Sequence, residues 1–169
     1  MLREVERPDG ATVRFEYDAL ARRTRKLFVP AGGVSATHET RFIWDSHTIV
    51  HELDSHAGLV TWYWEPKTLN VVAKERRGER LTVTLDHLGA PSAFHDGEGE
   101  RVWGRQHTDG LAPGGSSGDE CPWLQVGQYQ DAEIRETYNR YRYFDSAADG
   151  FILAFAPLGA ATSATREPE

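Results

Sequence analysis

The sequence lacks the features that mark disulfide-bonded, membrane-spanning and nucleic-acid-binding proteins. Its 169 residues include a single cysteine, Cys121, so no disulfide can form within the chain. No apolar run approaches the about 20 residues that cross a bilayer, and the opening residues contain no apolar segment typical of a signal peptide. The net charge of −7 argues against nucleic acid and against an anionic membrane surface as partners. We therefore expect a cytoplasmic protein, or one exported by a specialised secretion machine within a larger assembly.

Helical periodicity is also scarce, and only Asp131 to Arg140 could form one or two helical turns. Apolar residues instead alternate with polar ones, as in Val13 to Tyr17 and Leu81 to Leu85, and glycine-containing turn signals separate these runs. The pattern predicts an all-β fold, an antiparallel β-hairpin meander of about nine strands with little helix. Leu59 to Trp64, LVTWYW, is apolar on both faces and is the predicted best-buried strand.

The stretch YNRYRYFDSAADGF, Tyr138 to Phe151, alternates aromatic rings with arginines before it breaks into small residues. Read as one strand, it has mixed faces, because side chains two residues apart share a face. One face would carry Tyr138, Arg140, Arg142 and Phe144, and the other Asn139, Tyr141, Tyr143 and Asp145. Such a strand suits a wall that makes polar contacts on both sides. The basic run Arg22 to Lys26 is likewise expected to spread its charges over both faces of a strand, with a phosphate or glycan contact as the alternative.

Composition divides the chain into four parts. Residues 108–122 are rich in Gly, Ser and Pro and are predicted to form a flexible loop. This loop separates a β-sheet body, 1–107, from a C-terminal strand region, 123–155. A tail of small and polar residues, 156–169, is expected to fray.

Six motifs in a fixed order carry a family resemblance: DG…YDALARR, TRFIWDSHTIVHEL, TWYWEP, DHLGAP, DGEGERVW and GQYQDAEIRETYNRYRYFD. Together they resemble the C-terminal part of the core domain of Rhs (rearrangement hotspot) proteins, also called YD-repeat proteins, over about residues 8 to 155. The motif positions are Tyr17, Asp18, Asp86, His87, Leu88, Gly89, Pro91, Gly127, Tyr129, Tyr138, Asn139, Arg140, Tyr141 and Asp145.

The resemblance implies a β-sheet spiral that closes into a hollow shell around a toxin. In the family, the core ends in a signature whose aspartate works with an upstream aspartate to cut the chain. Asp145 matches the aspartate of the final YD, but the signature aspartate is replaced, because Ala156 precedes Pro157 and the register admits Phe155 as the alternative. Asp145 and Asp149 remain weak candidates for an autoprotease. Aspartyl chemistry needs two carboxyls that share a proton, so self-cleavage is predicted to be lost. The chain ends about a dozen residues after the signature, so we expect no toxin domain to follow.

These observations predict a non-catalytic structural fragment of a toxin-encapsulating Rhs-type shell, with no cofactor and no metal ion. The expected partner is a protein: an Rhs-type chain, a toxin, or a second copy joined through β edges. One alternative is a free-standing module that binds a protein or a glycan. Its candidate binding residues are Trp62, Trp64, Arg140 and Arg142, although core packing is favoured for the two tryptophans. The other alternative is a residual aspartyl autoprotease.

Two further candidate sites are weaker. His47 and His51 would share a strand face but lie about 13 Å apart, too far to bind one metal ion. Cys121 has no neighbouring base in the sequence that would make it a nucleophile.

Overall fold

The computed structural model describes residues 1–105, 121–139, 142–145 and 150–153, which form fourteen strands in two antiparallel sheets and contain no helix. The all-β antiparallel prediction is confirmed, with more and shorter strands than expected. The ten-stranded first sheet contains β1 (Glu4–Glu6), β2 (Thr12–Tyr17), β3 (Arg23–Val29), β4 (His38–Asp45), β5 (Thr48–Asp54), β6 (Gly58–Trp64), β7 (Val71–Arg76), β8 (Glu79–Leu85), β9 (Pro91–His95) and β10 (Arg101–Gly104). The second sheet contains β11 (Tyr129–Asp131), β12 (Glu136–Asn139), β13 (Arg142–Asp145) and β14 (Gly150–Leu153).

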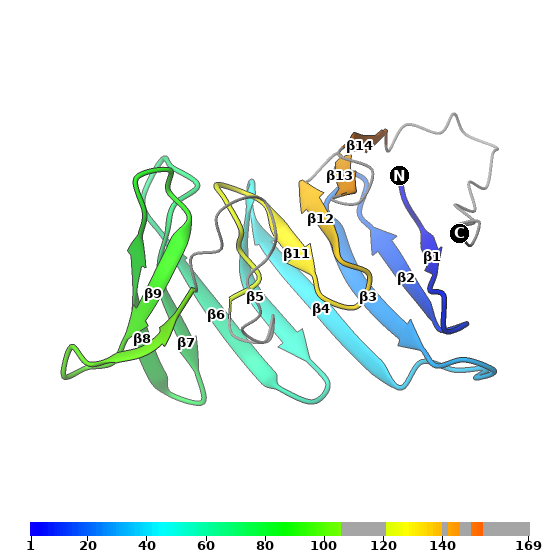
Figure 1. The fold of residues 1–169 in the computed structure, drawn as a ribbon, viewed down its shortest axis with the longest axis horizontal. Helices are drawn as coiled ribbons and strands as arrows, with labels where there is room; N and C mark the ends of the chain where they lie inside the picture. The colour runs from blue at the N-terminus through cyan, green and yellow to red at the C-terminus, as the bar shows by residue number, and fades with distance from the viewer. Residues whose placement is uncertain (106–120, 140–141, 146–149, 154–169) are drawn as a thin grey trace.

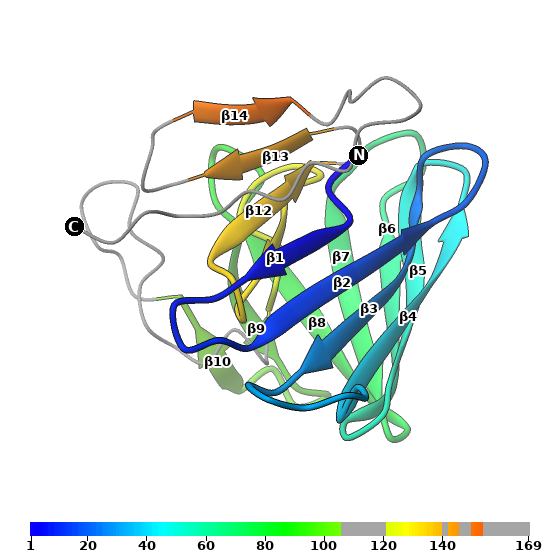
Figure 2. The same ribbon diagram turned by 90° about the vertical axis from the view of Figure 1, so that its right-hand side faces the viewer.

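Both sheets are meanders, because every strand pairs only with its neighbours in chain order (Figure 1). After a quarter turn, the first sheet is seen to curve around β11 and β12 (Figure 2). Aromatic side chains of the second sheet and its approach pack on one face of the first. They include Tyr129 against Phe42, Tyr138 against Trp44, and Trp123 against Trp62 and Trp64. The hydrophobic core therefore lies between the two sheets.

The opposite face of the first sheet is open, and this corrects the prediction for LVTWYW. In β6, Val60 and Trp62 point into the core, whereas Leu59 is 50% exposed. Leu59 pairs across the sheet with Leu53, which is also exposed. The apolar run predicts burial on both sides, but only one face of this sheet is covered in the described residues.

Bulges recur between alternate strand pairs of the first sheet. Pairing shifts by one residue at Tyr17, Trp44, Trp64 and Leu85. Each of these large residues precedes an acidic one, so the sequence pairs are Tyr-Asp, Trp-Asp, Trp-Glu and Leu-Asp. The partner strand carries one extra residue, which returns the following side chains to the core face. A large apolar or aromatic residue followed by an acidic one thus marks the end of the first strand in each of these pairs.

Three turns begin with an aspartate, and two of them directly follow the bulges at Tyr17 and Leu85. In Asp18–Arg22, Asp86–Ala90 and Asp96–Glu100, Oδ1 of the aspartate accepts hydrogen bonds from the backbone N–H groups two and four residues later. The fourth residue has positive φ and is Gly89 or Gly99 in two of the turns. In the third turn it is Ala21, with φ 62°. A carboxylate that fixes two backbone donors stabilises the turn whatever the intervening residues are.

Two local predictions for the C-terminal region are wrong. Residues 131–139 form no helix, because β11 ends at Asp131 in a turn whose N–H donors, from Ile134 and Arg135, bond to the Asp131 carbonyl. The stretch from Tyr138 is not one strand either, because β12 ends at Asn139 and β13, which begins at Arg142, pairs antiparallel with it. Tyr138 and Tyr143 therefore lie opposite each other and both are buried, which a single strand would not allow.

Candidate functional site

A buried ion pair joins the two sheets. Arg23, at the start of β3, donates from Nη1 to the Asp131 carboxylate at the end of β11, and both side chains are fully buried. The Tyr143 hydroxyl lies 3.3 Å from the same Nη1. The bulge after Glu16 makes this possible, because it places Arg23 opposite Tyr17 on the core face. The Asp131 carboxylate raises the pKa of Arg23, although burial alone would lower it.

Four aromatic rings surround the Arg23 guanidinium. Its carbon lies 4.4 to 5.4 Å from the ring centroids of Phe15, Phe42, Tyr129 and Tyr138. These rings come from both sheets, and the flat cation packs among them while Nη1 keeps its ion pair. The sequence pattern suggests that arginines pack among tyrosines in the strand from Tyr138. In the structure, Arg23 of β3 makes such contacts.

A second cation extends the cluster. Lys26 Nζ lies 3.3 Å from Asp131 Oδ1 and 2.8 Å from Glu133 Oε1. Burial alone would lower the pKa of Lys26, but the carboxylates of Asp131 and Glu133 outweigh it and raise that pKa. The basic run therefore does not simply lie in solvent. Two of its charges, on Arg23 and Lys26, point into the interface and hold the second sheet in place.

Glu52 is a buried carboxyl beside this cluster. Its Oε1 accepts a hydrogen bond from Trp62 Nε1 at 2.5 Å, and its Oε2 accepts one from the Tyr129 hydroxyl at 2.8 Å. Burial raises the pKa of Glu52, against the lowering effect of the hydrogen bonds from Tyr129 and Trp62. The carboxyl thus links β5, β6 and β11 through two donors.

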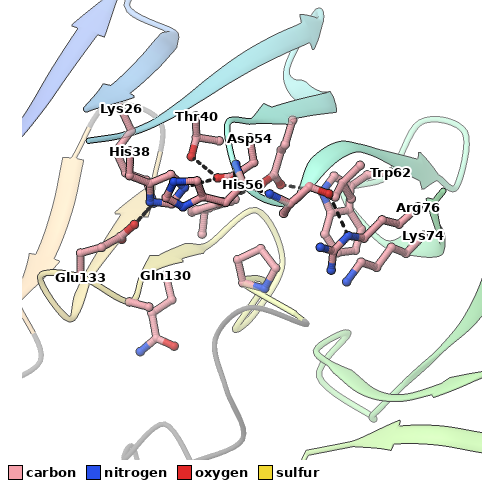
Figure 3. A pocket seen from close by; sticks show the side chains of 16 residues that line it. Lys26, His38, Thr40, Asp54, His56, Trp62, Lys74, Arg76, Gln130 and Glu133 are labelled. Carbon is pink, nitrogen blue, oxygen red and sulfur yellow. Dashed lines mark hydrogen bonds and ion pairs between the residues drawn. The ribbon is translucent and has the colours of Figure 1, made fainter. Parts of the chain in front are cut away.

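A polar cavity of about 390 Å³ opens beside the cluster, between strands of the first sheet and the β11 side of the second (Figure 3). One end holds His38, which stacks on His56 with ring centroids 4.5 Å apart and bonds to Asp54 at 2.6 Å. The Asp54 carboxylate also accepts hydrogen bonds from the Thr40 hydroxyl and from two backbone N–H groups. Burial opposes these donors, but together they lower the pKa of Asp54 to about 2. The other end holds Lys74 and Arg76 of β7 beside Trp62.

A larger groove of about 1010 Å³ lies on another side of the molecule, along the turns after β4 and β6. It gathers three of the predicted binding residues, because Trp62, Trp64 and Arg142 all line it, together with Asn139. Trp62 is 3% exposed and is held by Glu52, so its ring faces are covered. Trp64 is only half-buried, as is Tyr63, which also lines the groove, so a ligand could reach both rings.

The remaining predicted residues are dispersed. Tyr17 and Asp18 end the first hairpin unit, and the residues of DHLGAP form the turn between β8 and β9. In that turn Gly89 packs so closely on Val126 that a Cβ would lie 2.8 Å from it. Gly127 precedes Tyr129 in the approach to β11, and Asp145 pairs with Glu136 in the register of β13. Arg140, Tyr141 and Asp149 lie outside the described residues.

Cys121 is buried, and its Sγ lies 3.8 Å from the Trp123 carbonyl oxygen. Burial raises the pKa of the thiol to about 11, which disfavours the nucleophilic thiolate. Among the residues that the structure describes, no group of three His, Cys, Asp or Glu side chains is arranged to hold a metal ion. In the same part of the chain no helix could span a membrane.

Sequence reasoning missed the residues that join the sheets, namely Arg23, Lys26, Glu52 and Asp131. The run around Arg23 did carry a signal. It follows a turn into a strand that pairs with Val13 and Phe15, so one side of the run had to face the core.

The geometry defines an all-β architecture: an open, sequentially paired sheet with a smaller sheet docked on one face. No family model matches the chain. Two probable deoxyribonucleases of Dickeya dadantii, RhsB and RhsA, are each 28% identical over 95% of this chain and 11% of their own length. Toxin protein Tse5 of Pseudomonas aeruginosa is 28% identical over 86% of this chain and 13% of its own length. The chain thus spans about a tenth of the curated relatives it matches.

Among solved structures, the crystal structure of TcdB2-TccC3-TEV matches with a TM-score of 0.53 and 16% identity, over 86% of this chain and 8% of that one. This likeness concerns the fold alone. The sequence relatives are Rhs proteins, and the chain is similar to a region that makes up about a tenth of each.

Proposed function

We propose that this chain is a non-catalytic segment of the wall of an Rhs-type shell that encloses a toxin. The relatives support the toxin context, and the architecture supports the wall role. The strands follow one another in chain order, so more strands can be added at either end without rearranging the sheet. We further propose that the segment reaches its site of action within a larger exported assembly.

One observation carries the proposal: the first sheet ends at unpaired edges. In the described residues β1 pairs only with β2, and β10 only with β9. Hydrogen bonds join Arg3 to Phe15 and Arg7 to Ala11, so the alternating antiparallel pattern points the backbone groups of Glu4 and Glu6 away from β2. Such an edge is a template for a further strand, supplied by an Rhs-type chain, a cargo chain or a second copy.

Sedimentation velocity tests the edge. The parent chain should self-associate as its concentration rises, and Glu6→Pro should weaken the association about tenfold because proline offers no N–H to an added strand. Glu6→Ala removes the same charge but keeps the N–H, and it should associate at least as well as the parent. A parent chain that stays monomeric at high concentration would argue against the wall role.

The groove supports a second candidate, a module that binds a protein or a glycan. Trp64 offers part of an aromatic ring, and Asn139 and Arg142 place polar groups across the same groove. Saturable binding on a glycan array, lost in Trp64→Ala and in Arg142→Gln but retained in Leu88→Ala, would favour this function. Leu88 is exposed and lies outside the groove, so it controls for the loss of an apolar side chain.

A further inference from the structure

We propose that the cavity in Figure 3 is a binding site for a singly charged carboxylate, held at its β7 end by Arg76. This inference is independent of the wall role. At about 390 Å³ the cavity falls in the lower part of the range of about 300–1,000 Å³ found for small-ligand pockets. It therefore suits a ligand with the bulk of one amino acid side chain or a short acid.

The acidic groups of the cavity wall already have donors. Asp54 accepts from His38, Thr40 and the backbone, and Glu133 is paired with Lys26. Glu52 accepts from Trp62 and from Tyr129. These carboxyls consequently do not compete strongly for the Arg76 guanidinium at the other end of the cavity.

Arg76 is the group best placed to receive a carboxylate. Its Nε donates to the Ala57 carbonyl at 3.2 Å, which orients the guanidinium along the cavity wall. Its two terminal nitrogens make no hydrogen bond to the residues that the structure describes. A guanidinium edge that is fixed at one nitrogen and open at the others matches the two oxygens of a carboxylate.

Lys74 places a second positive charge on the same face of β7, two residues from Arg76. Its side chain is buried, and Nζ lies 5.4 Å from the ring centroids of both Trp62 and Phe94. Lys74 has a partner of its own, so the assignment to a carboxylate is carried by the open guanidinium edge of Arg76. The nearby carboxyls of Glu52 and Asp54 would repel a doubly charged phosphate more than a carboxylate. We therefore assign the cavity to a singly charged ligand.

The carboxylate could come from a free acid or from an Asp or Glu side chain of a polypeptide. A neutral amide of the same shape as each acid shows whether binding depends on the negative charge. Propionate is compared with propionamide, and the N-acetyl amide of glutamate with that of glutamine, at constant ionic strength. The readout is the NMR shift of the Arg76 Nε–H and Trp62 Nε1–H signals. Both acids should give saturable shifts and both amides none; a response to propionate alone would identify a free acid as the source.

Variants test the assignment to Arg76. Arg76→Gln should weaken binding at least tenfold, whereas Arg77→Gln, with the same charge change in the exposed next residue, should bind as the parent does. Arg76→Lys keeps the charge and should bind severalfold more weakly, which gives a measurement even if the glutamine variant folds poorly. Equal responses to acid and amide, or unchanged acid binding in both Arg76 variants, would overturn the proposal.

Discussion

Arg23 and Asp131 are 108 residues apart in the chain, yet they form an ion pair from which solvent is wholly excluded. The pair joins β3 of the large sheet to β11, the first strand of the small sheet. It turns two meanders, each paired only locally, into a single packed body.

Removing one partner of this pair should be strongly destabilising. Asp131→Asn leaves the Arg23 cation buried without its counter-charge, and the free energy of unfolding should fall by about 3–5 kcal/mol in urea titrations. The exposed pair Arg25–Glu16 provides the control, and Glu16→Gln should have a much smaller effect. Replacing Arg23 and Asp131 together with leucine should cost less than the sum of the two single changes. A small loss for Asp131→Asn would mean that the pair does not hold the sheets together.

Glu52 predicts a pH dependence with a definite sign. Burial raises the pKa of Glu52 in the folded state above its usual value of 4.5. Its contribution to stability is therefore fully present below pH 4.5 and is lost as the pH rises through the folded-state pKa. Relative to Glu52→Gln, the parent should gain free energy of unfolding as the pH falls from 8 to 4.5. Urea titrations of both proteins at each pH measure this difference, and a flat or opposite trend contradicts it.

The first aspartate-capped turn should be improved by one substitution. Ala21 has φ 62°, a conformation that costs an L-residue about 1 kcal/mol and that glycine adopts freely. Ala21→Gly should raise the free energy of unfolding by up to that amount. In the same turn, Ala19→Gly should lower it, because Ala19 has no positive φ and glycine only adds flexibility to the unfolded chain. Thermal unfolding compares the two, and equal effects would rule out backbone strain.

The purified chain should keep its full mass. The second catalytic aspartate is expected where this sequence has Ala156, or Phe155 in the alternative register, so cleavage, which needs two carboxyls that share a proton, is predicted to be lost. Intact-mass spectrometry over several days should show no shortening, in the parent or in Asp145→Asn. Loss of a C-terminal piece that Asp145→Asn stops would instead show a working autoprotease.

The strands that sequence alone could predict are those with an apolar core face. Val13 and Phe15 in β2, and Val83 in β8, alternate cleanly and are buried. In β3 the core face carries Arg23 and Lys26, so the pattern has the polarity of a solvated strand. The charges are buried only because carboxylates arrive from β11, and no local pattern encodes a contact over that distance.

The prediction of a single strand from Tyr138 is wrong for a related reason. Alternation of aromatic and polar residues continues from β12 into β13, so the sequence pattern shows no break where β12 ends. Only the burial of both Tyr138 and Tyr143 shows that the chain has reversed. The candidate binding groove was partly foreseeable, since Trp64 and Arg142 were both singled out, but their proximity depends on how the sheets dock.

The recurring bulge has a consequence for how genes of this kind can change in length. Each bulge shifts the inward side of the chain once per hairpin, so insertion of a whole hairpin preserves both the alternation of faces and the pattern of bulges. Duplication or deletion of such a unit between β7 and β11 would leave Arg23, Glu52 and their contacts with β11 in place. A single-codon insertion inside β3 would instead rotate Arg23 out of reach of Asp131.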